Sequence, residues 1–125
     1  MEPLQSMDVV FYFVTDWDRA KKFYGETLGL REVYSTDEGG WAEYDTNTPV
    51  RLAIHRTQPG QAVTKGGATA IFTVANADEA KADLEKRGVN FDGKIREIPG
   101  IMRLGTFLDP DGNKIQIYQN LSKGS

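Results

Sequence analysis

The hydrophobic and polar positions of this chain follow one succession of spacings, and that succession occurs twice. Residues 8–15 (DVVFYFVT) are apolar, β-branched or aromatic, which is typical of a buried strand. Asp16 is a good N-cap, and the apolar residues after it recur at helical spacing until Gly29, where a left-handed residue can end the helix. Turn-forming residues then separate three further predicted strands, at residues 30–35, 40–45 and 50–56.

The pattern begins again after residues 57–66, a polar segment whose Gly and Pro content is typical of a linker. Residues 68–74 predict a strand, and Asn76 with Glu79 forms a capping-box-like pair before a helix that Gly88 ends. The last predicted strands are residues 89–98, 101–108 and 114–119. The sequence therefore indicates an internal duplication of two βαβββ modules, residues 8–57 and 66–120, with a period of roughly sixty residues.

The last strand is preceded by the clearest turn signal in the chain. Asp109, Pro110, Asp111 and Gly112 have the chemistry of a type I turn. In the strand that follows, Ile115 and Ile117 alternate with polar and aromatic residues. Alternation therefore places Gln116 and Tyr118 on the face opposite the packed one, and what that second face contacts is the functional question.

Composition and charge narrow the function classes. The net charge of −3 and a pI near 5.1 give no basic stripe for nucleic acid, and no apolar run is long enough to span a membrane. Cysteine is absent, which removes disulfides and thiolate chemistry and fits a cytoplasmic protein. His55 is the only histidine, so one chain cannot supply a metal site that needs two imidazoles.

Four motifs in this order and spacing resemble the vicinal oxygen chelate superfamily, which includes glyoxalase I, extradiol dioxygenases and bleomycin resistance proteins. They are Val14-Thr15-Asp16, Phe23-Tyr24, Leu28-Gly29-Leu30 and Asp109-Pro110-Asp111-Gly112-Asn113. The resemblance covers roughly residues 8–119. It implies an α+β fold in which two βαβββ modules with mixed sheets curl around a cavity. It also implies two-fold pairing, so we predict a homodimer.

The resemblance also implies where metal-dependent members hold their ion: at one inward position on the first and last strand of each module. The matching positions here are Val9, Ala53, Thr69 and Gln116. Two of these side chains cannot bind a metal, and none is a carboxylate, whereas hard cations prefer several oxygens. We therefore predict no metal and no other cofactor.

Alternation along the strands gives the candidate site. The predicted ligand-binding residues are Phe11, Phe13, Trp41, Arg51, His55, Thr69, Gln116 and Tyr118. Phe11, Phe13 and Tyr118 can stack on a planar ligand, and Arg51 can pair with a ligand carboxylate or phosphate. If the protein is an enzyme, the candidates for proton transfer are His55, Glu43 and Tyr118. The pattern leaves open which side Trp41, Glu43 and Arg103 face.

The leading hypothesis is a metal-independent small-molecule-binding protein of the glyoxalase/bleomycin-resistance type. It would bind an aromatic or amphipathic compound in the cavity between the modules. The alternative is a lyase, isomerase or dioxygenase-like enzyme of the same fold with a non-standard site. A third possibility is a scaffold in which Phe11 and Phe13 fill a collapsed core. The sequence does not name the ligand.

Overall fold

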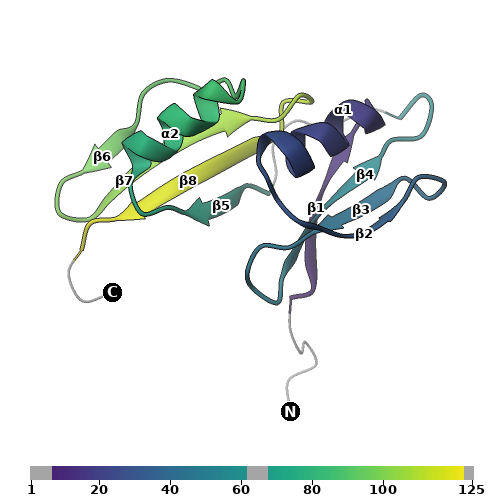
Figure 1. Ribbon diagram of the computed structural model, residues 1–125, viewed down its shortest axis with the longest axis horizontal. Helices are drawn as coiled ribbons and strands as arrows, with labels where there is room; N and C mark the ends of the chain where they lie inside the picture. Colours follow the sequence, from purple (N-terminus) through teal and green to yellow (C-terminus); the bar gives the residue numbers. More distant parts are fainter. Residues whose placement is uncertain (1–6, 62–67, 123–125) are drawn as a thin grey trace, which may run out of the picture. The chain divides into compact units, whose positions relative to one another are not determined.

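The computed structural model describes residues 7–61 and 68–122, and the chain divides into two compact units that contain one of these ranges each. Each unit is a βαβββ module with one four-stranded mixed sheet, so the predicted α+β fold is confirmed. Figure 1 shows a helix lying over one face of the sheet in each module. We call that face the helix side of the sheet and the opposite face its open side.

The first module contains β1 (Val9–Val14), α1 (Trp17–Lys22), the π-helical turn Phe23–Thr27, β2 (Glu32–Thr36), β3 (Trp41–Tyr44) and β4 (Arg51–Arg56). Its sheet has the order β1-β4-β3-β2, in which β1 and β4 are parallel and the other pairs are antiparallel. On β1, Tyr12 and Val14 are buried, whereas Phe11 is 41% exposed. This alternation with a period of two assigns Tyr12 to the helix side and Phe11 to the open side.

The first helix begins as the sequence predicts and ends with an irregularity that the sequence did not predict. The Asp16 side chain accepts a hydrogen bond from the Arg19 backbone N–H at 3.1 Å, which satisfies one of the free donors at the helix start. The Leu28 N–H then donates to the Phe23 carbonyl at 2.8 Å, the i to i+5 bond of a π-turn. The chain leaves this turn through Gly29, whose φ of +74° suits glycine.

The second module contains β5 (Ala70–Thr73), α2 (Ala77–Lys86), β6 (Arg96–Ile98), β7 (Met102–Leu108) and β8 (Lys114–Asn120). Its sheet has the order β5-β8-β7-β6, with β5 and β8 parallel. The Asn76 side chain accepts from the Glu79 N–H at 3.0 Å, which confirms the predicted cap of α2. Arg103 forms ion pairs with Asp78 at the start of α2 and with Glu97, so its side chain lies on the helix side.

The predicted strand at residues 89–98 is wrong over most of its length. Only Arg96–Ile98 is a strand, and before it Phe91 makes a single bridge to Phe107. The reason is the turn at Asp92-Gly93: Gly93 has a φ of +80°, which a continuing strand does not allow. Residues 92–95 therefore leave the sheet.

The turn at Asp109 is organised by one buried carboxylate. Asp109, which is 4% exposed, accepts from the N–H groups of Asp111 (2.9 Å) and Asn113 (2.7 Å) and from the Asn113 side-chain amide (2.8 Å). The Gly112 N–H also donates to the Asp109 carbonyl at 2.9 Å, which closes the predicted β-turn. The turn fixes the pairing of β7 with β8 and so the register of the open side of this sheet.

Candidate functional site

The open side of the first sheet carries a cluster of four aromatic rings, which we call the aromatic face: Phe11, Phe13, Trp41 and His55. The register brings them together, because Phe13 pairs with His55 on β4 and His55 pairs in turn with Trp41 on β3. The ring of Phe11 lies 5.3 Å from those of Phe13 and Trp41 and 5.8 Å from that of His55, between centroids. These separations are in the range of aromatic pair contacts.

Two polar groups are held in fixed positions on this face. The Trp41 indole N–H donates to Glu43 Oε2 at 2.8 Å, so the carboxylate lies beside the ring. His55 Nδ1 lies 3.0 Å from the Arg56 carbonyl oxygen, which can only accept. Nδ1 must therefore carry the proton in this bond, and in the neutral imidazole Nε2 is the unprotonated nitrogen. The register resolves the open question: Trp41 and Glu43 lie on the same side as His55.

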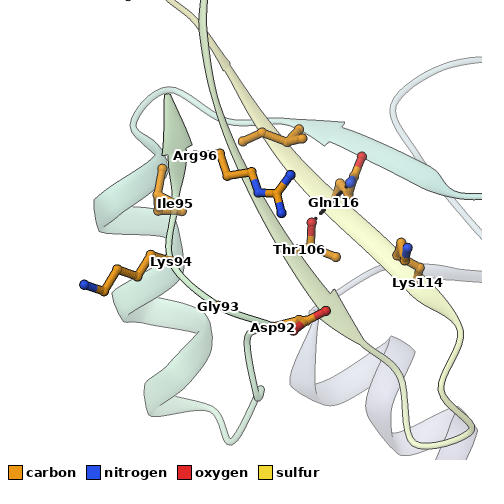
Figure 2. Close-up of a pocket in the computed structure, with 9 residues that line it drawn as sticks. Asp92, Gly93, Lys94, Ile95, Arg96, Thr106, Lys114 and Gln116 are labelled. Atoms are coloured by element: carbon orange, nitrogen blue, oxygen red, sulfur yellow. Dashed lines mark hydrogen bonds between the residues drawn. The ribbon is translucent and has the colours of Figure 1, made fainter. Parts of the chain in front are cut away.

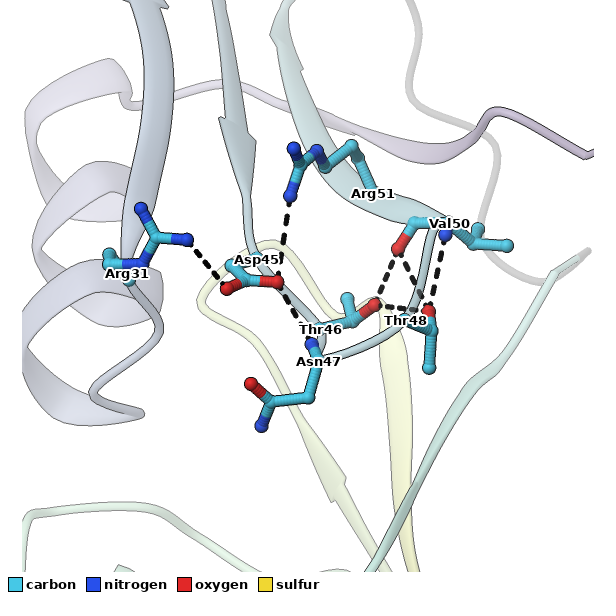
Figure 3. Close-up of polar contacts among 7 residues, drawn as sticks. All are labelled: Arg31, Asp45, Thr46, Asn47, Thr48, Val50 and Arg51. Carbon is cyan, nitrogen blue, oxygen red and sulfur yellow. Dashed lines mark hydrogen bonds and ion pairs between the residues drawn. The ribbon is translucent and has the colours of Figure 1, made fainter.

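Arg51 is held at the edge of the same face by an acidic neighbour. Figure 3 shows Asp45 between Arg51 and Arg31, with Oδ1 3.5 Å from Arg51 and Oδ2 2.8 Å from Arg31. The Asn47 backbone N–H donates to the same carboxylate at 2.9 Å. This backbone bond, followed by the bond from Arg31, lowers the pKa of Asp45 below its usual range. The role of Arg51 toward a ligand stays a prediction.

The open side of the second sheet has a different composition. Ile71 pairs with Gln116, and Gln116 pairs with Thr106 across β8 and β7. In the neighbouring row Thr73 pairs with Tyr118, Tyr118 with Leu104 and Leu104 with Arg96. Gln116 and Tyr118 therefore lie on the face that the alternation predicted. Thr69 precedes β5 and is half-buried.

A pocket of about 400 Å³ opens on this side of the second module. It is lined by residues 92–96, which leave the sheet at the Asp92-Gly93 turn, and by Leu104, Thr106, Lys114 and Gln116. Figure 2 shows the Arg96 guanidinium directed toward Thr106 and Gln116, whereas the Lys94 ammonium points away from them. The Gln116 amide donates to the Thr106 hydroxyl at 3.1 Å.

Alternation places Gln116 on a binding face, whereas the sequence pattern does not predict the other polar residues of this pocket. Arg96 and Asp92 were placed in one long strand, which gave them no particular environment. The signal that could have found them is the dipeptide Asp92-Gly93, a common turn former inside the predicted strand.

The strand register also shows whether the side chains at the four positions where the resemblance implies metal ligands can hold an ion. Ala53 pairs with Phe11, two residues after Val9, and Gln116 pairs with Ile71, two residues after Thr69. Val9 and Ala53 in the first sheet therefore occupy the same positions as Thr69 and Gln116 in the second. Val9 and Ala53 carry hydrocarbon side chains, so the first module offers no ligand atom there and the set does not fit a metal. Within residues 7–61 and 68–122, no three His, Asp or Glu side chains are grouped to hold an ion.

Residues 6–117 match the Glyoxalase/Bleomycin resistance protein/Dioxygenase superfamily, and the chain belongs to that superfamily. A lactoylglutathione lyase from Oryza sativa subsp. japonica is 29% identical over 123 residues, 86% of this chain. The chain spans only 42% of the length of that relative.

Solved structures of the superfamily share the fold over nearly the whole chain. A glyoxalase/bleomycin resistance protein/dioxygenase from Nocardioides has a TM-score of 0.79 at 17% identity and covers 100% of this chain and 89% of its own. TnmS3, an antibiotic binding protein from Streptomyces sp. CB03234, has a TM-score of 0.77 at 25% identity, covering 96% and 99%. In the part of the chain that the structure describes, no helix is long and apolar enough to cross a membrane.

Proposed function

We propose that this protein binds a planar aromatic small molecule on the aromatic face, without a metal ion. The observation that carries the proposal is the position of the four rings on the open side of the first sheet, with Phe11 41% exposed. Large rings that contact each other at a partly exposed surface offer both apolar area and stacking geometry to a flat ligand. The antibiotic-binding activity named for TnmS3, which shares the fold at 25% identity, supports this class of function.

The polar groups on this face would orient the ligand rather than provide most of its affinity. Glu43 accepts from Trp41, and His55 presents Nε2 when Nδ1 donates to the Arg56 carbonyl. A ligand hydroxyl or amine could donate to either group. A small number of fixed polar groups within apolar walls is typical of small-molecule sites.

The proposal is tested by titration with 2-naphthol, a planar compound that is neutral at pH 7, with binding followed by fluorescence. We expect Phe11→Ala to weaken binding roughly tenfold, because it removes one stacking contact and its buried area. Ile71→Ala is the matched control, since Ile71 is 57% exposed and occupies the position of Phe11 in the second module. Equal losses in the two variants, or no binding by the parent protein, would refute the proposal.

A second candidate function is a lyase or isomerase reaction on the same face. It is favoured by the 29% identity to lactoylglutathione lyase and by His55 Nε2, which is free to take a proton when Nδ1 is the donor. Proton transfer by His55 predicts that His55→Gln abolishes turnover and leaves 2-naphthol binding within twofold. A variant that binds 2-naphthol much more weakly would instead assign His55 to ligand contact alone.

We also propose that the protein is a cytoplasmic homodimer. The open edge strands β2 and β6 leave backbone groups that a second chain can cover. Sedimentation at micromolar concentration should show twice the chain mass of 13.9 kDa. A single species at the chain mass would contradict the dimer.

A further inference from the structure

We infer that the aromatic face selects a cation: the planar ligand carries one protonated amine, which Glu43 binds. This assignment rests on the proposed function, because the aromatic body of the ligand would lie on the same rings. It adds the sign of the ligand's charge and the residue that recognises it. Three features of the first module carry it: a carboxylate without an ion pair among the described residues, the rings beside that carboxylate, and an arginine that is already paired.

The Glu43 carboxylate has no cationic partner in residues 7–61 and 68–122. Its only side-chain hydrogen bond there comes from the Trp41 indole N–H, a neutral donor, which reaches Oε2 at 2.8 Å. The side chain is half-buried, and Oε1 accepts no hydrogen bond within the same ranges. A carboxylate that is partly removed from water is stabilised more by a charged donor than by a neutral one. The position at Oε1 therefore suits an ammonium group.

Aromatic side chains lie on both sides of this carboxylate. Glu43 pairs with Tyr34 on β2, which places Tyr34 on the open side, and Tyr34 is 55% exposed. On its other side Glu43 pairs with Ala53, which pairs in turn with Phe11. The Phe11 ring lies 5.3 Å from that of Trp41, whose indole N–H holds Glu43. The face of an aromatic ring attracts a cation within about 6 Å, so the rings and the carboxylate favour the same positive group.

Arg51 is the residue of this face that would favour an anionic ligand instead, and it already has a partner. Its guanidinium lies 3.5 Å from Asp45 Oδ1, and Figure 3 shows it directed toward that carboxylate. Asp45 also pairs with Arg31, whose side chain is 70% exposed, so water screens that second cation. His55 in its neutral form presents Nε2 as an acceptor, which also suits an ammonium donor. The face therefore favours a positive charge on the ligand.

The charge is tested with three compounds that carry the same naphthalene ring, titrated into the full chain at pH 7 and followed by calorimetry. They are 2-naphthylmethylamine, which is protonated at this pH, the neutral 2-naphthylmethanol and the anionic 2-naphthoate. We expect the amine to bind roughly tenfold more tightly than the alcohol, and 2-naphthoate to bind more weakly than the alcohol. Equal binding of amine and alcohol, or tighter binding of 2-naphthoate, would overturn the inference.

Two charge-removing variants locate the cation. Glu43→Gln keeps an oxygen that can accept from the Trp41 indole, and it should abolish the preference for the amine over the alcohol. Glu26→Gln removes the same charge from an exposed side chain in the π-helical turn, so it should leave that preference within about twofold of the parent value. Equal losses in the two variants would indicate attraction to the net charge of −3 and overturn the assignment.

Tyr34→Leu gives a second test that does not depend on the fold, because the side chain is 55% exposed. It should reduce the preference for the amine roughly threefold through loss of one cation–π contact, and an unchanged preference would remove Tyr34 from the site. Binding of the alcohol and the amine with equal affinity would leave the proposed function standing and refute the charge alone. Binding of none of the three compounds by the parent protein would refute both.

Discussion

The two sheets have the same strand order and matching strand pairings. Their residues are more alike on the helix side than on the open side. On the helix side, four pairs of corresponding positions carry similar residues. The pairs, first module before second, are Tyr12 and Phe72, Ile54 and Ile117, Ala42 and Gly105, and Tyr44 and Phe107. On the open side, Arg51 and Lys114 are both cations, but five other pairs of corresponding positions carry unlike residues. The pairs are Phe13 and Thr73, His55 and Tyr118, Trp41 and Leu104, Glu43 and Thr106, and Ala53 and Gln116.

This difference shows which side of a duplicated sheet is constrained by packing. A position under a helix must match the volume of its neighbours, because interiors are close-packed. A position on the open side has no such constraint from its own helix. The first module has aromatic rings there and the second has polar groups beside a pocket, so the chemistry of the two faces differs although the fold is repeated.

The largest expected effect comes from truncating a ring on the helix side. Phe107 is 2% exposed and its ring lies 5.2 Å from that of Phe91. Phe107→Ala should lower the free energy of unfolding by about 3–5 kcal/mol, through lost burial and the cavity left behind. Phe11→Ala, on the open side of the first module, should cost about 1–2 kcal/mol because Phe11 is 41% exposed. Urea denaturation measures both; similar losses would remove the distinction between the two sides.

The next effect tests a buried hydroxyl that the first module has and the matching position of the second module lacks. The Tyr44 hydroxyl is buried without a hydrogen-bond partner in the described part of the chain, whereas the second module has Phe107 at this place. Tyr44→Phe should therefore raise the free energy of unfolding by up to about 1 kcal/mol. The reverse change, Phe107→Tyr, should lower it by about 1–3 kcal/mol. Thermal unfolding of both variants checks this, and a loss of stability in Tyr44→Phe would contradict it.

The same position predicts a pH effect with a definite sign. Burial, with a smaller contribution from Glu32, raises the pKa of Tyr44 from 10.0 to about 12. Its neutral form is therefore favoured in the folded state, and this contribution to stability is complete below pH 10 and is lost as the pH rises toward 12. Unfolding curves of Tyr44→Phe should show a smaller alkaline loss than those of the parent protein. Equal alkaline losses in the two proteins would contradict this.

The smallest effect concerns the ion pairs at the end of β3. Because the pKa of Asp45 is lowered in the folded state, its contribution to stability is present above the usual value of 3.8 and is lost as the pH falls through the lowered pKa. Asp45→Asn should therefore lose less stability than the parent between neutral pH and about pH 2. Urea midpoints at the two pH values check this, and identical acid losses would contradict it.

The sequence predicted the strands that bury one side and therefore alternate between apolar and polar residues. Alternation located β1 and β8 and placed Phe11, Phe13, Gln116 and Tyr118 on the open sides. It failed at residues 89–98, where Asp92-Gly93 forms a turn within an apolar run. The π-turn after Lys22 was also missed, since an i to i+5 bond leaves no spacing signal.

The candidate site was harder to predict for a related reason. The alternation of side chains along a strand shows which side of the sheet a residue faces, but not which strands lie next to each other. The grouping of Phe13, His55 and Trp41 depends on the pairing of β1, β4 and β3, which is a tertiary property. Arg96 reaches its pocket only because residues 92–95 leave the sheet, and the predicted strand excluded that path.

The central claim, that the aromatic ligand binds the open side of the first sheet, is tested most directly by chemical-shift mapping. Titration of the isotope-labelled protein with 2-naphthol should shift the Trp41 indole N–H and the backbone amides of Phe11, Phe13 and His55. The Trp17 indole, which donates to Asp37 in the same module at 2.9 Å, should remain unshifted. Shifts that centre on Trp17 while the Trp41 indole signal stays in place would contradict the account.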